Sequence, residues 1–457
     1  MIDFVLTAAQ QSLRGSVRLF ADTYLARARK DYEQIPAGHV PKGISSNGDR
    51  SHSSSPADGK TRFQSTKPIL ATATSMGLVK SLVPPPVGGT AGTLVDSIII
   101  TEELFAVEPS VSLTLLGIGL GLTPVFLGDF KGRENIRAEI LAPFTDQGDG
   151  TVAPLASLCF SEPTGSANYL EEEGDGAQTT AAYDTDADSW IVNGDKIWGT
   201  NCSGWDDLGA DLQVLFVRNP AVTTSKTDSS MLVLLTRAVL DQNRSSGNHN
   251  CYSVICHATT PGFTASSGPH IRFSNLRIPS HYVLATGSDA VRIITATFTS
   301  SAVIVGAMSV GIMRSAFDSA LHFARTHTAG GNVTVLEHQS PADVLIDIKC
   351  RIEACRALTW KAASAIDANL AGADELAYEV KIFASEAAVK TVAEAMRVVG
   401  VRAYDAARWP FAGLMADALL LPVFDGGNQG VRRRQVQRIF LGEGYQPWAA
   451  TFGVGGG

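Results

Sequence analysis

The hydrophobic pattern of this 457-residue chain changes its period twice, and that change limits the possible fold more than any other feature. Up to about residue 150, and again from about Ala285, apolar residues recur every three or four positions, as in amphipathic helices. Between Val152 and Ile278 the pattern consists of short β-like runs separated by turn residues. The clearest helical stretches are 13–30, 95–127, 293–326, 341–370 and 375–399. This order of helices, a small β unit and more helices predicts an α+β protein.

The same changes of pattern predict three domains. An N-terminal helical domain spans residues 1–151. It contains an insertion at 43–60 that is rich in Ser, Gly, His and Asp, and we expect this insertion to be a flexible surface loop. A β domain spans 152–284, and a helical bundle spans 285–457.

Short apolar runs predict the strands of the β domain. They cover 155–160, 190–192, 212–217 and 231–235. The pair Asn193-Gly194 directly follows the second run and is a strong signal for a two-residue hairpin turn. We therefore expect the chain to reverse direction at this pair.

Composition and charge exclude several classes of protein. The chain is 45% hydrophobic, enough to bury a large core, and its formal net charge of −8 argues against binding of nucleic acid. The longest apolar stretch, Val111 to Phe126, is interrupted by three glycines and by Pro124. On this reading no apolar stretch reaches the roughly 18–20 residues of a membrane span, so we expect no membrane partner.

The ends of the chain and its cysteines indicate a cytoplasmic location. Met1-Ile2-Asp3-Phe4 lacks the basic start and apolar core of a secretory signal, and Gly455-Gly456-Gly457 is not a peroxisomal address. Six cysteines are scattered without a CxxC pair or the histidines that zinc would require. We expect reduced thiols and no metal site.

The segment from Pro422 to Gly430 is the strongest candidate for chemistry. Asp425 follows an apolar pair and precedes two glycines, and the chain then continues into a basic helix that begins Val431-Arg432-Arg433-Arg434. A desolvated carboxylate is a better base than one in water, and a nearby arginine keeps it ionised. The segment taken alone is equally compatible with a helix-capping turn.

Motifs in the β region support a catalytic interpretation. Ser161-Glu162-Pro163 begins a polar turn that reaches Asn168, and Asn193-Gly194-Asp195-Lys196-Ile197-Trp198 ends a strand. In this order they resemble the flavin-binding β domain of the acyl-CoA dehydrogenase superfamily. Other segments resemble its nitroalkane oxidase branch, including 267–270, 305–308, 337–340, 424–428 and 447–451. The likeness extends from Phe4 nearly to the C-terminus, apart from the insertion.

The resemblance implies an acyl-CoA dehydrogenase-like fold: an N-terminal helical domain, a middle small β-barrel or sandwich domain, and a C-terminal four-helix bundle. It also implies an FAD-dependent oxidase that converts neutral primary or secondary nitroalkanes to aldehydes or ketones, releasing nitrite and hydrogen peroxide. Asp425 falls where acyl-CoA dehydrogenases carry a Glu, and would abstract the α-proton so that the carbanion adds to flavin N5. Arg432 and Ser301 match the residues that pair with this base.

The resemblance also assigns cofactor contacts. Trp198, Gly199 and Thr200 match an aromatic wall and a hydroxyl near the flavin. His338 and Gln339 match residues that a neighbouring subunit contributes, which implies a homotetramer, and Gly400 matches a glycine near the pyrophosphate. The remaining expected contacts are Leu158, Cys159, Phe160, Ser161, Ala167, Asn168, Tyr169, Val423, Phe424, Gly426 and Gly427.

Two departures from the family pattern stand out. Where the family carries an arginine about ten residues before the His-Gln pair, this chain reads Thr328-Ala329-Gly330-Gly331, and Arg325 is the nearest replacement. Leu421 occupies a position where the family has an aromatic hydroxyl, which should alter the substrate pocket. Neither departure affects the proposed base.

Alternatives remain open from the sequence alone. Ser301 could bond only to helix carbonyls, Arg432 could lie on a solvated face, Trp198 could be core, and His338 could bond to backbone at a helix start. At the level of function, the alternatives are an enzyme that desaturates an acyl-CoA thioester, and a catalytically inert flavin-binding assembly partner.

Overall fold

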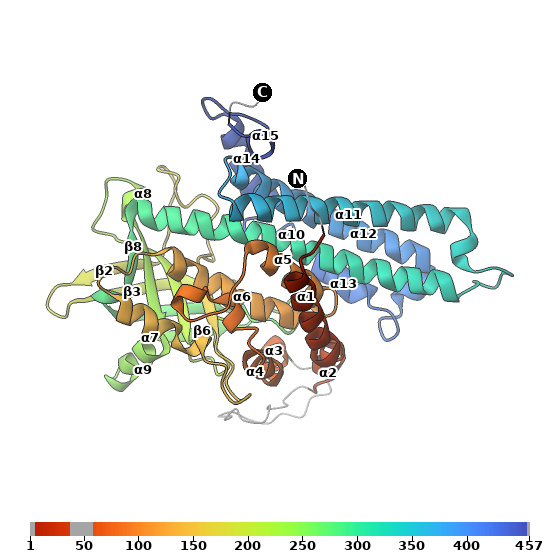
Figure 1. Cartoon of the computed structure of the whole chain (residues 1–457). Helices are drawn as coiled ribbons and strands as arrows, with labels where there is room; N and C mark the ends of the chain where they lie inside the picture. Colours follow the sequence, from red (N-terminus) through yellow and green to blue (C-terminus); the bar gives the residue numbers. More distant parts are fainter. Residues whose placement is uncertain (1–4, 37–57, 455–457) are drawn as a thin grey trace.

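The computed structural model describes residues 5–36 and 58–454 (Figure 1). Of the expected insertion at 43–60, residues 43–57 lie outside the described part. Its last residues do not form a loop: the Asp58 side chain accepts a hydrogen bond from Thr61 N at 2.8 Å and caps helix α3 (Gly59–Ser65). The prediction of a flexible loop is therefore wrong at this end, because an N-cap starts a helix there.

Helices make up the region before the sheet. They are α1 (Ala8–Phe20), η1 (Ala21–Leu25), α2 (Ala28–Glu33), α3, α4 (Lys67–Ser75), η2 (Lys80–Leu82), η3 (Pro85–Val87), α5 (Leu94–Phe105), α6 (Pro109–Leu127) and α7 (Glu134–Thr145). The expected helix at 95–127 is two helices, because Glu108 is extended and its carboxylate accepts from Val111 N at 2.7 Å. Pro109 then fits the first position of α6.

One mixed sheet follows. Its strands are β1 (Ala156–Cys159), β2 (Thr180–Asp184), β3 (Ser189–Lys196), β4 (Leu212–Arg218), β5 (Ser230–Thr236), β6 (Tyr252–Cys256), β7 (His270–Pro279) and β8 (Val283–Thr286), with short helices α8 (Lys226–Ser229) and α9 (Arg237–Ser245) between them. The order is β6-β7-β3-β2-β4-β5-β8, and β1 runs parallel beside β4. Strand β5 is buried along its whole length.

The hairpin expected at Asn193-Gly194 is wrong. Both residues lie inside β3, which pairs with β2 on one side and with β7 on the other, and the register with β7 shifts between Val192 and Gly194. Gly194 has φ +133°, and a Cβ there would lie 2.6 Å from Thr179 Cα. The glycine therefore serves a β-bulge and a close backbone approach instead of a turn. The chain reverses between Asp184 and Ser189.

Long helices follow the sheet. They are α10 (Gly287–Thr326), η5 (Val335–Glu337), α11 (Gln339–Asp367), α12 (Ala373–Val399), η6 (Gly400–Tyr404), α13 (Phe411–Leu420), η7 (Asn428–Arg432), α14 (Arg433–Phe440) and α15 (Ala449–Phe452). Helix α10 runs from the sheet to the far end of the molecule, packed on α11, α12 and α5 (Figure 1). A Cβ at Gly306 would lie 2.3 Å from Val380, so this glycine is what permits α10 and α12 to pack so closely.

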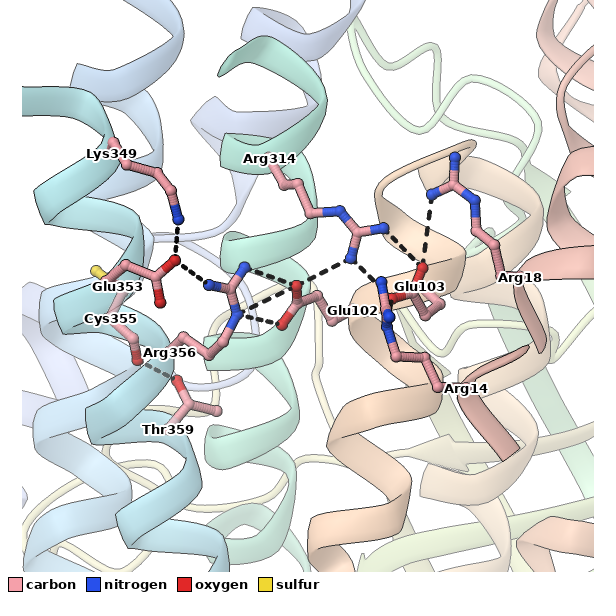
Figure 2. A network of polar contacts seen from close by, with 10 residues as sticks. All are labelled: Arg14, Arg18, Glu102, Glu103, Arg314, Lys349, Glu353, Cys355, Arg356 and Thr359. Atoms are coloured by element: carbon pink, nitrogen blue, oxygen red, sulfur yellow. Dashed lines mark hydrogen bonds and ion pairs between the residues drawn. The ribbon is translucent and has the colours of Figure 1, made fainter. Parts of the chain in front are cut away.

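An ion-pair network joins four of the helices (Figure 2). Arg314 of α10 lies between Glu102 and Glu103 of α5, at 3.0 and 2.7 Å. Arg356 of α11 also binds Glu102 at 2.8 Å, and Arg14 of α1 binds Glu103 at 2.6 Å. The two carboxylates that interrupt the apolar stripe of α5 are thus paired, as buried charges must be.

Among the described residues, two helices are long and apolar enough to cross a membrane. α6 has a mean hydropathy of 1.8 over its apolar window, and α10 has 1.7. The expectation that no apolar stretch is long enough was therefore wrong. The windows are 67% and 61% buried inside the protein, which is also typical of core helices.

Candidate active site

The turn after α13 holds Asp425 in an unusual backbone conformation. Asp425 has φ +53° and Gly426 has φ +73°, so two consecutive residues adopt the left-handed region. Aspartate tolerates this region better than most residues, and glycine tolerates it freely. Asn428 N donates to Pro422 O at 2.9 Å and closes the turn. The carboxylate of Asp425 points inward, with only 6% of the side chain exposed.

Two side chains hold this carboxylate. Ser301 Oγ of α10 donates to Asp425 Oδ1 at 2.7 Å, and Arg432 Nη2 donates to Oδ2 at 3.0 Å. Arg432 is itself buried, also donates to the Asp425 carbonyl at 2.7 Å, and lies over the Tyr378 ring at 5.1 Å. The structure thus brings together the three residues that the sequence predicted. Ser301 also bonds to the Phe298 carbonyl at 3.2 Å, so the helix-carbonyl interpretation accounts for only part of its role.

Burial controls the electrostatics of Asp425. Removal from water raises the pKa of its carboxyl above the ordinary value, although Arg432, the Ser301 hydroxyl and Lys381 all act in the opposite direction. The result is a carboxylate that is more basic than one in water yet is paired with an arginine. This is the electrostatic environment of a general base.

Sequence reasoning missed two residues beneath the base. Lys381 of α12 is fully buried, and its Nζ donates to Asn428 Oδ1 at 2.8 Å. Asn428 in turn donates to Ser385 Oγ at 3.0 Å. A lysine flanked by Val380 and Ile382 on an apolar helix face was the available signal.

An aromatic cluster connects the base with the end of strand β1. The Phe160 ring packs against Tyr169 at 5.1 Å, Phe216 at 5.0 Å and Phe298 at 5.3 Å between centroids. Phe298 lies one turn before Ser301 on α10, and its carbonyl accepts from Arg432 Nη2 at 3.0 Å. Burial raises the pKa of the Tyr169 phenol to about 12, so it stays neutral.

A buried ion pair supports the turn that follows β1. Glu162 accepts from Lys196 Nζ at 2.8 Å and from the backbone N–H groups of Gln178 and Thr179 at 2.6 and 2.9 Å. Lys196 also donates to the Phe160 carbonyl at 3.0 Å. These residues stood in the sequence motifs but were not assigned to the site. They fix the end of the strand where Phe160 and Ser161 lie.

The residues expected along the flavin form an open wall. Leu158 and Cys159 are buried in β1, whereas Phe160, Ser161 and Thr200 are half-buried. Ile197 N donates to Ser161 O at 2.9 Å and joins the two segments. Gly199 is buried, and a Cβ there would lie 3.2 Å from Cys159 Sγ.

The open side of this wall fits a planar cofactor. Trp198 adopts φ +64° and is 56% exposed, which is unusual for the largest apolar side chain. Val423, beside the Asp425 turn, is 66% exposed, while Phe424, Gly426 and Gly427 are half-buried. Because Trp198 is so exposed, the core-packing alternative for it is wrong. An exposed indole beside backbone amide groups can hold a flat polar ring such as isoalloxazine.

The second predicted cofactor turn is tied to the helix after the base. Arg434 of α14 donates to Ala167 O and to Asn168 Oδ1, each at 2.7 Å, and pairs with Glu171 at 3.0 Å. Its neighbour Arg433 pairs with Glu386 of α12 at 3.0 Å. The three consecutive arginines thus contact the base, α12 and the β region, respectively.

Three predicted cofactor residues lie at the opposite end of the long helices. His338 and Gln339 are exposed at the start of α11, beyond the end of α10 (Figure 1). Gly400 ends α12, and a Cβ added there would have no atom within 4 Å. About 25 residues of α10 separate Ser301 from that end, or roughly 38 Å at 1.5 Å per residue. The structure therefore does not bring these residues to the Asp425 site of the same chain.

The two residues that depart from the family pattern, Leu421 and Arg325, lie in different environments. Leu421 is fully buried in an apolar cluster that includes Phe263 and against which Phe424 packs. Arg325 is exposed near the end of α10. Its contact with a phosphate stays a prediction. Within residues 5–36 and 58–454, no group of His, Cys, Asp and Glu side chains could hold a metal ion.

Comparisons with known proteins identify the fold and the family. The family profile of the acyl-CoA dehydrogenase C-terminal domain matches residues 291–441. The solved butyryl-CoA dehydrogenase of Megasphaera elsdenii aligns with a TM-score of 0.76 at 21% identity over 96% of this chain and all of that chain. The chain thus has the acyl-CoA dehydrogenase fold, the fold of a class of FAD-dependent oxidoreductases.

The sequence relatives narrow this class. Nitroalkane oxidase of Podospora anserina is 43% identical over 99% of both chains, and that of Fusarium oxysporum is 38% identical over 99% of this chain and 98% of that one. The solved Podospora anserina enzyme aligns with a TM-score of 0.89 at 42% identity, covering 99% of this chain and all of that chain. The chain belongs to the nitroalkane oxidase family.

Proposed function

We propose that this protein oxidises neutral primary and secondary nitroalkanes with Asp425 as the base. One nitroalkane, one O2 and one water give one aldehyde or ketone, one nitrous acid (released as nitrite) and one hydrogen peroxide. The observation that carries the proposal is the buried Asp425 carboxylate, held between Ser301 and Arg432 at 2.7 and 3.0 Å.

The solved relatives support the roles of these residues. One is an active-site mutant with Asp replaced by Asn, crystallised with 1-nitrooctane, and another has Ser replaced by Ala and was crystallised with 1-nitrohexane. In a third, an aspartate and an arginine seven residues apart have roles in the reaction. Asp425 and Arg432 have the same spacing.

Each residue has a physical task. Asp425 takes the α-proton of the nitroalkane, which is acidic enough for a single base. Arg432 keeps the carboxylate ionised in a site where burial favours the neutral acid. Ser301 donates to the oxygen that Arg432 Nη2 does not bind, and so fixes the rotation of the carboxylate.

FAD is the cofactor of this fold, and when bound it accepts the substrate's electrons and passes them to O2. The end of β1 and residues 198–200 would hold its ring, and Arg434 would fix the 167–169 turn beside it. Phe298 would keep the ring side and the base side at a constant separation, because its ring packs on Phe160 and its carbonyl binds Arg432.

The proposal includes a cytoplasmic homotetramer with no nucleic-acid or membrane partner. What supports the oligomer is the location of His338, Gln339 and Gly400, which are too far from the base to complete the site of their own chain. Light scattering gives the mass of the particle. A Gln339→Ala variant should bind FAD more weakly while its Asp425 site stays intact.

The test of the activity is an anaerobic mixture of the yellow protein with neutral nitroethane, followed by admission of air. We expect flavin absorbance near 450 nm to bleach with release of nitrite, and then to recover with formation of peroxide. Flavin that stays oxidised with nitroalkanes but bleaches with acyl-CoA thioesters would favour the thioester alternative. That alternative has only fold-level support, and Asp is one methylene shorter than the Glu of those enzymes. A protein inert to both would be the assembly partner.

A further inference from the structure

A buried polar cluster lies directly beneath the turn that carries Asp425. Lys381 of α12 is 0% exposed, and Asn428 is 2% exposed. Lys381 Nζ donates to Asn428 Oδ1 at 2.8 Å, while Asn428 Nδ2 donates to Ser385 Oγ at 3.0 Å and Glu386 Oε1 at 3.2 Å. The Asn428 amide therefore bonds to three side chains of α12, and it also lies 3.5 Å from the Ile382 carbonyl oxygen.

Asn428 also belongs to the turn that carries Asp425, through its backbone N–H. Asn428 N donates to Pro422 O at 2.9 Å, which closes the turn around Asp425. Asn428 is the first residue of η7, and Arg432 is the last. Asn428 is thus linked to Pro422, before Asp425, and begins the helix that carries Arg432, after it. The hydrogen bonds between Asn428 and α12 therefore set the position of the left-handed Asp425 backbone.

Lys381 adds a charge to this anchorage. The groups that face it are the Asp425 carboxylate in the turn, the Arg432 guanidinium in η7 and the Glu386 carboxylate on α12. Arg433 of α14 already pairs with Glu386 at 3.0 Å. Glu386 is therefore partly neutralised, and Asp425 is the buried anion left to the Lys381 ammonium.

We propose that Lys381 is a positioning residue for the base: through Asn428 it anchors the Asp425 turn to α12, and its ammonium group holds the Asp425 carboxylate ionised. This inference rests on the proposed function of Asp425 and adds a second cation to the site. Arg432 binds the carboxylate directly from η7, at 3.0 Å, whereas Lys381 acts from α12 through Asn428 and through its charge.

The electrostatics agree with this geometry. Burial lowers the pKa of Lys381 to about 7, opposed chiefly by Asp425. Below that pH the ammonium is charged and lowers the pKa of Asp425; above it the contribution fades. Loss of the charge should therefore make Asp425 harder to ionise.

The experiment compares Lys381→Met with Lys381→Gln, Lys381→Arg and Ser385→Ala. Met removes the charge and the hydrogen bond, Gln keeps a donor for Asn428 without the charge, Arg keeps the charge, and the Ser385 variant removes another anchor of Asn428. Lys361→Met is the surface control, since Lys361 is exposed on α11 and donates to Thr451 Oγ1 at 2.7 Å. Two readouts are used: the pH profile of kcat/KM with nitroethane, and the infrared carboxyl band of Asp425, assigned by its loss in Asp425→Asn.

We expect the acidic limb of the profile and the infrared titration to move up by about one pH unit in Lys381→Met and Lys381→Gln, because a nearby cation typically lowers a carboxyl pKa by 1–3 units. Lys381→Arg and Lys361→Met should keep the wild-type limb. Ser385→Ala should lower kcat without moving the limb. The Gln variant gives the answer if the Met variant does not fold.

The role of the Lys381 charge would be overturned if the acidic limb of kcat/KM were unchanged in both Lys381→Met and Lys381→Gln. Those variants would then show only a uniform loss of activity or of thermal stability. A Ser385→Ala variant with wild-type kcat would overturn the anchorage. If the wild-type protein consumes no nitroalkane, the proposed function fails, but the infrared titration of Asp425 still decides the effect of Lys381.

Discussion

Two buried carboxylates in this molecule, Glu162 and Asp425, are each paired with one buried cation, yet their acidities are shifted in opposite directions. Burial alone would raise the pKa of Glu162, but Lys196 and two backbone N–H groups outweigh it and lower the pKa. At Asp425 burial prevails over Arg432, Ser301 and Lys381, and the pKa is raised. At Glu162, Lys196 stabilises the anion most, and the backbone N–H groups of Gln178 and Thr179 add to it. Glu162 is a permanently ionised support for a strand end, whereas Asp425 retains the basicity needed to take a proton.

The largest effect should come from removing the base. Asp425→Asn keeps the shape and the contacts of the turn but cannot accept the α-proton. We expect a yellow, folded protein whose kcat/KM for neutral nitroethane falls about 10³-fold, within the range for loss of a general base. Stopped-flow flavin reduction measures it. Normal turnover of the neutral substrate would show that Asp425 is not the base.

Glu162→Gln tests the proposed structural role of the Glu162–Lys196 ion pair. It leaves Lys196 buried without its partner, and breaking such a pair costs about 3 kcal/mol or more of unfolding free energy. We expect a lower urea midpoint and poor FAD retention, with an unchanged pH limb in whatever active protein remains. A Glu162→Gln protein of full stability that instead shifts the pH profile would reverse the two roles.

Arg432→Met should raise the already elevated pKa of Asp425 further. Arg432 opposes burial, so its removal raises the pKa of Asp425 further. Because the base acts only when ionised, and protonates as pH falls through its pKa, the acidic limb of kcat/KM should move to higher pH. We expect a loss of about 10–100-fold at neutral pH, with fold and colour retained. The measurement is the pH profile; a uniform loss with an unmoved limb would contradict it.

The sequence predicts the residues that contact the Asp425 carboxylate but not the residues beneath its turn. Asp425, Arg432 and Ser301 were predicted together because they match a family pattern, although seven residues between Asp425 and Arg432 prove no contact. Lys381 and Asn428 were missed, because nothing in the sequence links residue 381 to residue 428 before α12 and the turn pack together. The family pattern also predicted His338 and Gly400 as cofactor contacts, and the structure places both far from the Asp425 turn of their own chain.

Errors in the fold have a common cause. Local turn chemistry predicts a hairpin at Asn193-Gly194, but β3 pairs with both β2 and β7, and Gly194 forms a bulge against Thr179. The continuous helix expected at 95–127 ignored the stop formed by Glu108 and Pro109. In each case a tertiary contact or a cap decided between conformations that the hydrophobic period alone could not distinguish.

The smallest expected effect concerns the link between the two sites. Arg434 joins the 167–171 turn to α14, but its ion pair with Glu171 is partly exposed, with side chains 29% and 47% accessible. Such pairs contribute little, roughly 0.5 kcal/mol, so Arg434→Gln should weaken FAD binding only about threefold through loss of the contacts to Ala167 and Asn168. Arg433→Gln is the matched control, because its pair with Glu386 does not touch the β region.

Fluorescence titration of the apoprotein with FAD measures both variants. Equal weakening in the two would mean that the charge of α14, and not the contact with the turn, matters for the cofactor. A selective loss in Arg434→Gln, with the pH limb unmoved, would mean that support of the flavin turn and tuning of the base are separable. This would hold even though Arg434 and Arg432 are only two residues apart, on either side of the junction of η7 and α14.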